Sequence, residues 1–416
     1  MLKAIAAAGL GLLAAGTPPP GGPRLLDPAI RGWTPEARER LDAFILAAGR
    51  TAASYDPTRP PVAAFDWDNT VFKHDMGDAT MYWLLRHGKI RQPAGRDWAK
   101  TNPHLTPAAR QALNAACDAL ADPGQPLPTA TATACADTIF AVYDGGRTPG
   151  GEPAFDRPQT RTQHQAYAWL AQLLAGYTPA EIRDFARAAY QQHGAAPISA
   201  TQTVGSHRGV TAWGRIYPQM KDLIGALRAN GFAIWVVSAS PQHVIEPVAD
   251  LVGIPAERVI GIRTVLADGR ATATLQGCGG IPAGPDAPMT FDRGKRCWLN
   301  KVVFGMPDGP AQLDPHPDPR MRPVFAAGDS DTDIAFMQDA TGLKLAIDRQ
   351  KTQLMCNAYR NVGGNWLVQP MFLQPLPPRA KAYPCSTAAD HAGEPLRDET
   401  GLPIPDQADR AHMPGE

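Results

Sequence analysis

The sequence has no excess of charge of either sign and no long apolar run beyond its first residues. Its 416 residues contain 40 basic and 40 acidic side chains, so the formal net charge is zero. This balance gives no sign of a nucleic-acid or membrane-surface partner, and we expect neither nucleic-acid binding nor stable insertion into a membrane. A small ligand is therefore the expected partner, and the sequence leaves the oligomeric state open.

The six cysteines form neither a CxxC pair nor a Cys/His cluster, which argues against a structural zinc site. An even number of cysteines in an exported chain permits disulfides, and six cysteines allow many different pairings. Pairing in chain order would close the shortest loops, but the sequence does not decide among the alternatives.

The N-terminal residues 1–22 read MLKAIAAAGLGLLAAGTPPPGG, which is one lysine, an apolar run and then a Pro/Gly stretch. This order is typical of a secretory signal peptide, and the apolar run is too short to span a bilayer. We therefore expect the protein to be exported to the periplasm or secreted by a bacterium. The alternative interpretation is an alanine-rich first helix.

The rest of the chain follows two patterns of hydrophobic residues. Residues 23–75 and 197–370 contain short apolar runs followed by helical segments, which predicts an α/β core with a parallel sheet. Residues 76–196 are mostly helical in pattern and are predicted to form a cap inserted after the first strand. Residues 371–416 are rich in proline and have little periodicity, which predicts a lightly packed C-terminal tail.

The stretch VAAFDWDNTVF, residues 62–72, joins an apolar run to a polar turn. An apolar run without alternation suits a strand covered on both faces, and ligands of such sheets bind beyond the carboxyl ends of the strands. Asp66, Asp68 and Thr70 are spaced two apart and would share one side of an extended chain. Two carboxylates this close repel each other unless a cation separates them, and Mg²⁺ prefers oxygen ligands. The alternative is a polar turn that binds nothing.

Further polar residues follow predicted strands or begin predicted helices. Ser238 follows a short predicted strand, Lys295 opens a predicted helix, and GDSDTD places Asp329 and Asp333 after another strand. Taken alone, the serine could cap a helix, and the lysine could be a solvated charge with Lys301 competing for its role. Because all of them occur in one order at strand or helix ends, they indicate a single site.

In this order, DWDNT, VVSAS, GK and GDSDTD resemble the four motifs of the haloacid dehalogenase-like phosphatase superfamily. The resemblance implies a three-layer, doubly wound (Rossmann-like) parallel sheet with a helical cap inserted after the first strand. It also implies Mg²⁺-dependent hydrolysis of a phosphomonoester through an aspartyl-phosphate. Asp66 would be the nucleophile, and Asp68 the general acid and base. Dehalogenases lack an acid at the position of Asp68, because expelling a halide needs no proton.

The same resemblance implies roles for the other motif residues. Mg²⁺ would be held by the Asp66 side chain, the Asp68 backbone carbonyl and Asp329. Asp333 would be a nearby ligand or a partner of the ligands. The groups expected to bind the phosphoryl oxygens, with the lysine also balancing the charge of the nucleophile, are Thr70, Ser238, the backbone N–H of Ala239, and Lys295.

Residues 76–196 resemble the cap of phosphoserine phosphatase-like members, and HDMGDATMYWLLRHGKI with VVSASPQHVI looks like the secreted phosphorylcholine phosphatases of bacteria. This resemblance implies a small amino-alcohol phosphate, such as phosphorylcholine, as the substrate. Asp78 and Trp83 are the predicted contacts to its cationic group. Other candidates in the cap are Tyr82, Tyr143, Tyr167 and Trp169, with the acidic Asp144, Glu152 and Asp156. The alternatives are a phosphoserine or broad-specificity phosphatase, a phosphoryl transferase, and a protein that binds phosphorylated ligands without turnover.

Overall fold

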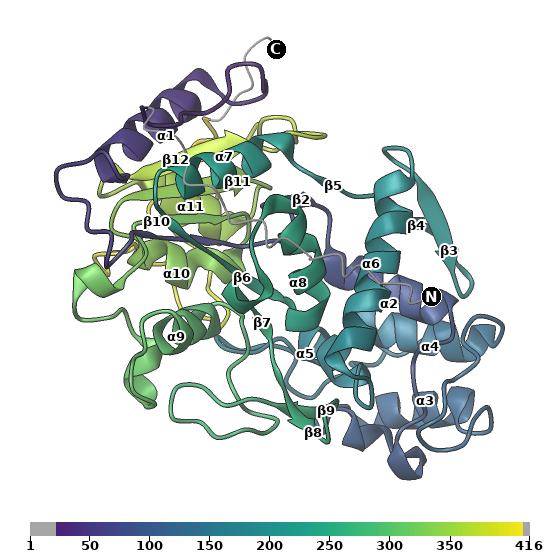
Figure 1. Ribbon diagram of the computed structural model, residues 1–416. Helices are drawn as coiled ribbons and strands as arrows, with labels where there is room; N and C mark the ends of the chain where they lie inside the picture. Colours follow the sequence, from purple (N-terminus) through teal and green to yellow (C-terminus); the bar gives the residue numbers. More distant parts are fainter. Residues whose placement is uncertain (1–21, 411–416) are drawn as a thin grey trace, which may run out of the picture.

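The computed structural model describes residues 22–410 (Figure 1). The predicted signal peptide, residues 1–22, lies outside the described residues except for Gly22. Within residues 22–410, no helix combines the length and the apolar character that a membrane crossing requires.

A six-stranded parallel sheet forms the centre of the molecule, with the strand order β12-β11-β10-β1-β6-β7. Its strands are β1 (Val62–Phe65), β6 (Ala233–Pro241), β7 (Val259–Ile262), β10 (Phe325–Gly328), β11 (Leu343–Asp348) and β12 (Trp366–Pro370). The first strand lies between β10 and β6 and pairs in parallel with both. The strands are apolar with little alternation because both faces of the sheet are covered.

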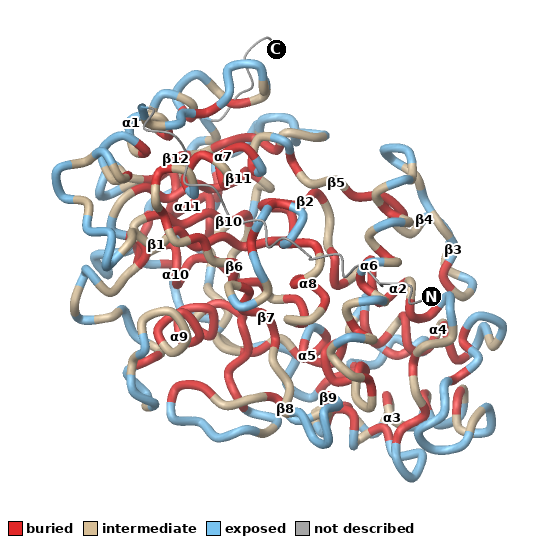
Figure 2. Tube along the Cα trace, viewed as in Figure 1, coloured by how far each residue is buried: buried red, intermediate tan, exposed pale blue. Residues whose placement is uncertain are grey.

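Helices cover the two faces of the sheet and make three layers. One face packs against α1 (Pro35–Ala48), α7 (Pro218–Ala229) and α8 (Gln242–Ala249), and the other against α9 (Arg293–Val302), α10 (Ile334–Asp339) and α11 (Thr352–Arg360). Successive side chains of β1 alternate between these two cores: Ala63 and Phe65 join the first, and Ala64 joins the second. Buried residues mark the strands in Figure 2. The predicted three-layer α/β fold is confirmed.

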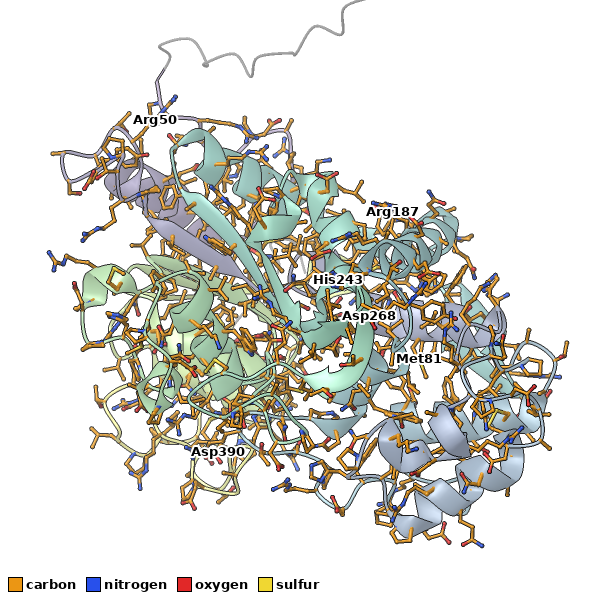
Figure 3. All side chains as sticks on the ribbon, turned by 60° about the horizontal axis from the view of Figure 1, so that its bottom comes forward. Arg50, Met81, Arg187, His243, Asp268 and Asp390 are labelled. Atoms are coloured by element: carbon orange, nitrogen blue, oxygen red, sulfur yellow. A yellow bond between two sulfur atoms is a disulfide. The ribbon has the colours of Figure 1, made fainter. Side chains whose placement is uncertain are left out.

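Between β1 and β6 the chain leaves the sheet and forms a helical insertion. Its helices are α2 (Met76–Arg86), α3 (Pro107–Cys117), α4 (Thr133–Asp144), α5 (Gln165–Leu173) and α6 (Pro179–Ala195). Two small two-stranded sheets accompany them. In the first, β2 (Phe72–Lys73) pairs with β5 (Arg215–Ile216), and in the second, β3 (Thr201–Val204) pairs with β4 (His207–Thr211). Thr106 and Thr178 cap α3 and α6, and a proline follows each. Met81 of α2 is buried in this insertion, whereas Arg187 of α6 lies at the surface (Figure 3).

After β7 the chain forms an antiparallel hairpin, β8 (Thr264–Ala267) with β9 (Arg270–Leu275). The six cysteines are paired in chain order, Cys117–Cys135, Cys278–Cys297 and Cys356–Cys385. Among the pairings that the sequence left open, the structure has the sequential one. Single-turn 3-10 helices occupy Ala94–Arg96, Trp98–Lys100, Asp250–Val252, Ala256–Arg258, Pro310–Leu313, Pro319–Met321 and Asp331–Asp333.

The C-terminal segment, residues 371–410, is packed more closely than its composition predicts. Tyr383, Leu396 and Ile404 are buried in the core on the α11 side of the sheet. Cys385 bonds to Cys356 of α11, which attaches the segment covalently to that layer. Most side chains of residues 371–410 are exposed and the segment has no helix or strand, but these few buried residues and the disulfide attach it to the core. The sequence did not predict this attachment, because single buried residues in an irregular chain leave no periodic pattern. Residues 411–416 lie outside the described part.

Candidate active site

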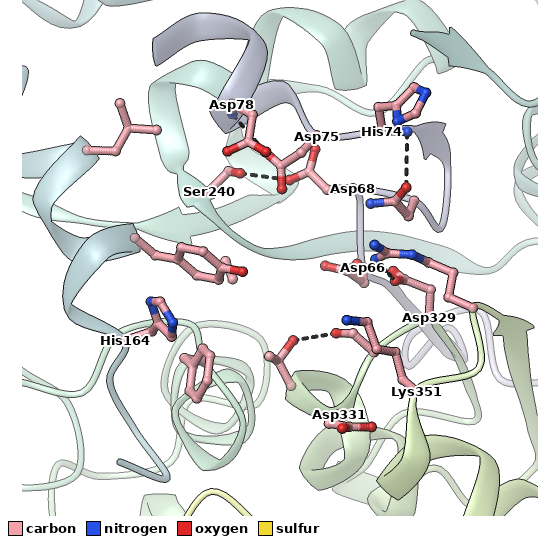
Figure 4. Close-up of a pocket in the computed structure, with 18 of the residues that line it drawn as sticks. Asp66, Asp68, His74, Asp75, Asp78, His164, Ser240, Asp329, Asp331 and Lys351 are labelled. Atoms are coloured by element: carbon pink, nitrogen blue, oxygen red, sulfur yellow. Dashed lines mark hydrogen bonds and ion pairs between the residues drawn. The ribbon is translucent and has the colours of Figure 1, made fainter. Parts of the chain in front are cut away.

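A cavity of about 430 Å³ lies where the carboxyl ends of the central strands meet the helical insertion. Asp66 and Asp329 line it from the ends of β1 and β10, and Asp78 and Tyr143 line it from α2 and α4. In doubly wound sheets this edge is the usual position of a ligand. Figure 4 shows the residues around this cavity.

Lys295 joins two carboxylates at the base of the cavity. Its Nζ donates hydrogen bonds to Asp66 Oδ1 at 2.6 Å and to Asp333 Oδ1 at 2.5 Å. All three side chains are buried. The second oxygen of Asp333 accepts the backbone N–H groups of Asp329 and Ser330, each at 3.0 Å, so this carboxylate has a donor on both oxygens. The first turn of α9 and the turn after β10 thus hold the Asp66 carboxylate from one side.

Asp329 and Thr70 complete this cluster. Thr70 Oγ1 lies 2.8 Å from Asp329 Oδ1 and 3.2 Å from Asp66 Oδ2, so its hydroxyl is shared between two carboxylates. Arg349 Nη1 donates to the other oxygen of Asp329 at 2.6 Å. The predicted phosphate contact Thr70 therefore contacts the acids of the site.

The carboxylate oxygens of Asp66, Asp329 and Asp333 lie within 4.8 Å of one another. A buried set of oxygen donors fits Mg²⁺, which is a hard cation that takes oxygen ligands. Each of the three carboxylates has a hydrogen-bond donor near both of its oxygens, so these bonds do not rank them as metal ligands. Asp66 and Asp329 are the side-chain ligands that the sequence resemblance implies. The Asp68 carboxylate is not part of this group, and any contribution from that residue would come through its backbone carbonyl, as the sequence resemblance implies.

The Asp68 side chain is oriented by neighbours on both oxygens. Oδ1 accepts the backbone N–H of Met76 at 2.7 Å, and Oδ2 accepts the Ser240 hydroxyl at 2.7 Å. Ser238 is fully buried inside β6, which runs on to Pro241, and its hydroxyl lies 3.3 Å from Asp68 Oδ2. Ala239 and Ser240 line the cavity. The sequence analysis missed Ser240, although the repeated serine in SAS at a strand end is a usable signal.

Burial and mutual repulsion perturb the acids of the site. Burial raises the pKa of Asp66 well above its usual value, and the charge of Asp333 adds to this while Lys295 opposes it. Burial also raises the pKa of Asp68, with a further contribution from Asp75. Burial by itself would lower the pKa of Lys295, but the charges of Asp333 and Asp66 raise it above its usual value, so the lysine stays protonated. The site therefore favours a bound cation, which would relieve the repulsion among its carboxylates.

The wall of the cavity formed by the insertion carries two more carboxylates. Asp75 caps α2 by accepting the backbone N–H of Asp78 at 2.9 Å, and Asp78 Oδ1 accepts the Tyr143 hydroxyl at 2.8 Å. Burial raises the pKa of both carboxyl groups, and Asp75 adds to the shift at Asp78. In the described chain no Lys, Arg or His forms an ion pair with either of them. Asp75 was not predicted from the sequence, whereas Asp78 was.

Trp83 does not line the cavity. Its ring stacks on His87, with centroids 4.2 Å apart, and on Phe185 at 5.6 Å. Asp78 and Tyr82 are four residues apart and share the face of α2 that lines the cavity, and Trp83, one residue further on, is turned away from it. Of the other candidates, Tyr82, Tyr143 and Tyr167 line the cavity, and Trp169, Asp144, Glu152 and Asp156 do not.

Other cavity residues come from segments that the sequence analysis did not connect with the site. Arg349 and Lys351 follow β11, and His391 comes from the C-terminal segment. The rule that ligands bind at the carboxyl ends of strands could have identified the first two. His391 carries no comparable signal in the sequence.

Comparisons with known proteins agree with this geometry. The family model of haloacid dehalogenase-like hydrolase matches residues 135–338, which include Ser238, Lys295, Asp329 and Asp333. A curated relative, phosphorylcholine phosphatase of Pseudomonas aeruginosa, is 22% identical over 317 residues, covering 74% of this chain and 77% of the relative.

One solved structure is similar in fold, and a second is more distant. The crystal structure of a conserved functionally unknown protein from Anaerococcus prevotii matches with a TM-score of 0.58 and 19% identity, covering 81% of this chain and 92% of that one. A protein with unknown function from Bordetella pertussis has a TM-score of 0.41 and 17% identity over 74% of this chain and 98% of its own, which is too distant to support an argument. The family match, the parallel sheet and the acids gathered around Lys295 together identify the chain as a member of the haloacid dehalogenase-like hydrolases.

Proposed function

We propose that this enzyme is a Mg²⁺-dependent phosphomonoester hydrolase that works through an aspartyl-phosphate. The single observation that supports this most is the pairing of Lys295 with Asp66 at the end of β1, with Asp68 held beside it by Ser240. Binding alone would not require a buried carboxylate nucleophile together with an oriented second acid. Asp68 also supports phosphoryl chemistry, since an alkoxide leaving group needs a proton.

The reaction uses the two aspartates in sequence. A carboxylate oxygen of Asp66 attacks phosphorus, the bond from phosphorus to the ester oxygen breaks, and Asp68 gives its proton to the leaving alkoxide. In the second half, Asp68 takes a proton from water, which attacks phosphorus and releases phosphate and the free Asp66 carboxylate. Lys295 keeps the nucleophile in place and offsets the negative charge that gathers around phosphorus. When bound, Mg²⁺ supplies the positive charge that lets two anions approach each other.

The substrate we propose is a small amino-alcohol phosphate, such as phosphorylcholine. Asp75 and Asp78 are half-buried in the wall formed by the insertion and make no ion pair with a described Lys, Arg or His, although the charge of Arg349 acts on Asp75. The rings of Tyr82, Tyr143 and Tyr167 line the same space. A bound ammonium group would neutralise these carboxylates and contact the faces of the rings. The name of the curated Pseudomonas aeruginosa relative supports the same substrate class.

Hydrolysis of p-nitrophenyl phosphate by the purified protein, with Mg²⁺ and with EDTA, tests the reaction class. We expect activity only with Mg²⁺. Asp66→Asn should lower this activity by several orders of magnitude, because the nucleophile is lost. Equal turnover by Asp66→Asn would refute the assignment. Phosphate-ester binding without turnover in the wild type would favour the binding protein instead.

A substrate panel tests the amino-alcohol assignment. Phosphorylcholine, phosphoethanolamine and phosphoserine should have higher kcat/KM than glucose phosphate. Asp78→Ala should raise KM for the cationic esters by about tenfold, and for p-nitrophenyl phosphate far less, because only the former lose an ion pair. Asp156→Ala is the matched control, since this aspartate lies in the same insertion but does not line the cavity. Equal effects on all substrates would refute the role of Asp78.

We also propose that the protein is exported. Its three disulfides support this, because such bonds persist in oxidising compartments and are rare in the cytosol. Fractionation of cells of the source organism, with an antibody to this chain, tests the proposal. Recovery in the cytosol with reduced cysteines would refute it.

A further inference from the structure

The turn that follows β11 brings two cations to the cavity, and we call residues 348–351 the basic turn. Asp348 Oδ1 accepts the backbone N–H of Gln350 at 2.7 Å, and Gln350 has a φ of +57°. The Gln350 side chain leads away from the cavity and donates to the carbonyl of Pro377 at 2.6 Å. Arg349 and Lys351, on either side of it, both line the cavity. The local geometry of the turn therefore presents its two cations to the site.

The cavity is otherwise poor in positive charge. Apart from histidines, its cationic lining residues are Lys295, Arg349 and Lys351, whereas its acidic lining residues are Asp66, Asp68, Asp75, Asp78, Asp329 and Asp331. A phosphate ester that enters such a site is repelled by the carboxylates, and this repulsion is strong where water is excluded. Binding therefore requires fixed cations in addition to a metal.

The three cations differ in how far they are already engaged. Lys295 already donates to Asp66 and Asp333. Arg349 donates one N–H, from Nη1, to Asp329, and its other N–H groups have no acceptor within the described residues. The Lys351 ammonium makes neither a hydrogen bond nor an ion pair with any described residue. The basic turn thus holds most of the uncommitted donors among these lysine and arginine side chains.

We propose that Arg349 and Lys351 form an anion subsite that binds the phosphoryl group of the substrate and, after the reaction, the phosphate product. In Figure 4, Lys351 lies on one side of Asp66, and Asp75, Asp78 and Ser240 gather around Asp68 on the other. The basic turn and the cavity wall that carries Asp75 and Asp78 thus lie on opposite sides of the nucleophile. This arrangement suits a ligand that is anionic at one end and cationic at the other. The inference rests on the proposed function for the identity of this anion.

A purely structural role for Arg349 makes a different prediction. If the guanidinium only positioned Asp329, removing it would disturb the metal ligand and weaken Mg²⁺ binding, while phosphate binding to the metal-loaded protein would stay the same. If Arg349 binds phosphate, its removal weakens phosphate binding. The affinity for Mg²⁺ is then retained or increased, because a competing cation has left Asp329.

Isothermal titration of the full chain with inorganic phosphate, in saturating Mg²⁺, tests the proposal. We expect Arg349→Gln to weaken phosphate binding by roughly tenfold or more, because a charge-assisted hydrogen bond is lost, and Lys351→Gln to weaken it severalfold. Arg349→Lys should restore part of the affinity. Arg320→Gln is the control for loss of one positive charge, since this exposed arginine pairs with Asp318 at the surface.

Titration of the same variants with Mg²⁺ alone, and their thermal unfolding, complete the experiment. The proposal would be overturned if Arg349→Gln bound phosphate with an affinity within twofold of the wild type. It would also be overturned if Arg349→Gln lost Mg²⁺ binding or thermal stability together with phosphate binding, and Arg349→Lys did not restore them. If the wild type binds phosphate through these residues but hydrolyses no monoester, the proposed function fails and the subsite stands. If it hydrolyses monoesters with phosphate affinity unchanged in the variants, the subsite fails and the proposed function stands.

Discussion

Lys73 is buried next to the active site and forms no ion pair with a carboxylate within residues 22–410, so removing its charge should stabilise the protein. The residue is 6% exposed, and its ammonium contacts the sulfur of Met371 at 3.1 Å. Burial lowers the pKa of Lys73 to about 8, the charge of Arg349 lowers it as well, and Asp329 acts in the opposite direction. The charged form of this lysine is therefore less stable in the folded protein than in water.

The free energy involved follows from the two pKa values. Between about pH 8 and the ordinary value of 10.5, the unfolded chain binds a proton that the folded protein has lost, so stability rises with pH across this range. Below about pH 8 the charged lysine destabilises the fold by the full difference, which is about 3 kcal/mol. Lys73→Met removes the charge and keeps an unbranched side chain of similar length. The variant should thus be more stable at pH 7 by up to about 3 kcal/mol.

Urea unfolding of the oxidised protein at several pH values between 7 and 10.5 measures this effect. The advantage of Lys73→Met should shrink as the pH rises and approach zero near pH 10.5. Lys344→Met is the matched control: this lysine is equally buried but pairs with Glu399, so its loss leaves a carboxylate without its partner and should destabilise the protein. A Lys73→Met variant that is less stable than the wild type at pH 7, or whose advantage does not change with pH, would refute the reasoning.

Other substitutions test the site and its support. Ser240→Ala removes the 2.7 Å hydrogen bond to Asp68 and should lower kcat by about tenfold with a smaller change in KM; an unchanged kcat would contradict the orienting role. Replacing Cys278 and Cys297 together by alanine removes a disulfide between residues 19 apart in sequence. The free energy of unfolding, measured with urea, should fall by about 3 kcal/mol, and an unchanged value would exclude this contribution. Burial raises the pKa of Asp348 to about 6, so the folded protein binds this proton more tightly than the unfolded chain does. As the pH falls from 7 to 4, the wild type should therefore gain up to about 3 kcal/mol of stability relative to Asp348→Asn. A difference in stability that does not change with pH would contradict this pKa shift.

The sequence determined those features that depend on neighbouring residues. The apolar runs before Asp66 and Asp329 are buried parallel strands, and Lys295 lies in the first turn of a helix, as their patterns predict. Thr34 followed by Pro35 begins α1 because the cap and the fixed proline φ act within one turn. The order of these elements predicted an α/β core with a parallel sheet, since parallel strands with intervening helices build only a few architectures. The three-layer, doubly wound arrangement was implied by the resemblance of the motifs.

The tertiary structure decided which side chains share one space. Trp83 and Asp78 lie on the same short helix, and only the packing of α2 against the core directs one of them into the cavity. Arg349 becomes an active-site residue because β11 lies beside β10 in the sheet, so the ends of the two strands are neighbours. Strand order is a long-range property that no local pattern of residues specifies.

The C-terminal segment illustrates the same limit. Its buried residues, its bond from Cys385 to Cys356 and the contribution of His391 to the cavity all depend on contacts with distant parts of the chain. Hydrophobic periodicity reports only on residues within one regular element, and an irregular segment has none. The sequence by itself thus determined the strands, the helices and the motif that carries the chemistry. The folded chain decided the pairing of the cysteines, the partners of each carboxylate and the wall that faces the substrate, because those arise from packing between segments far apart in sequence.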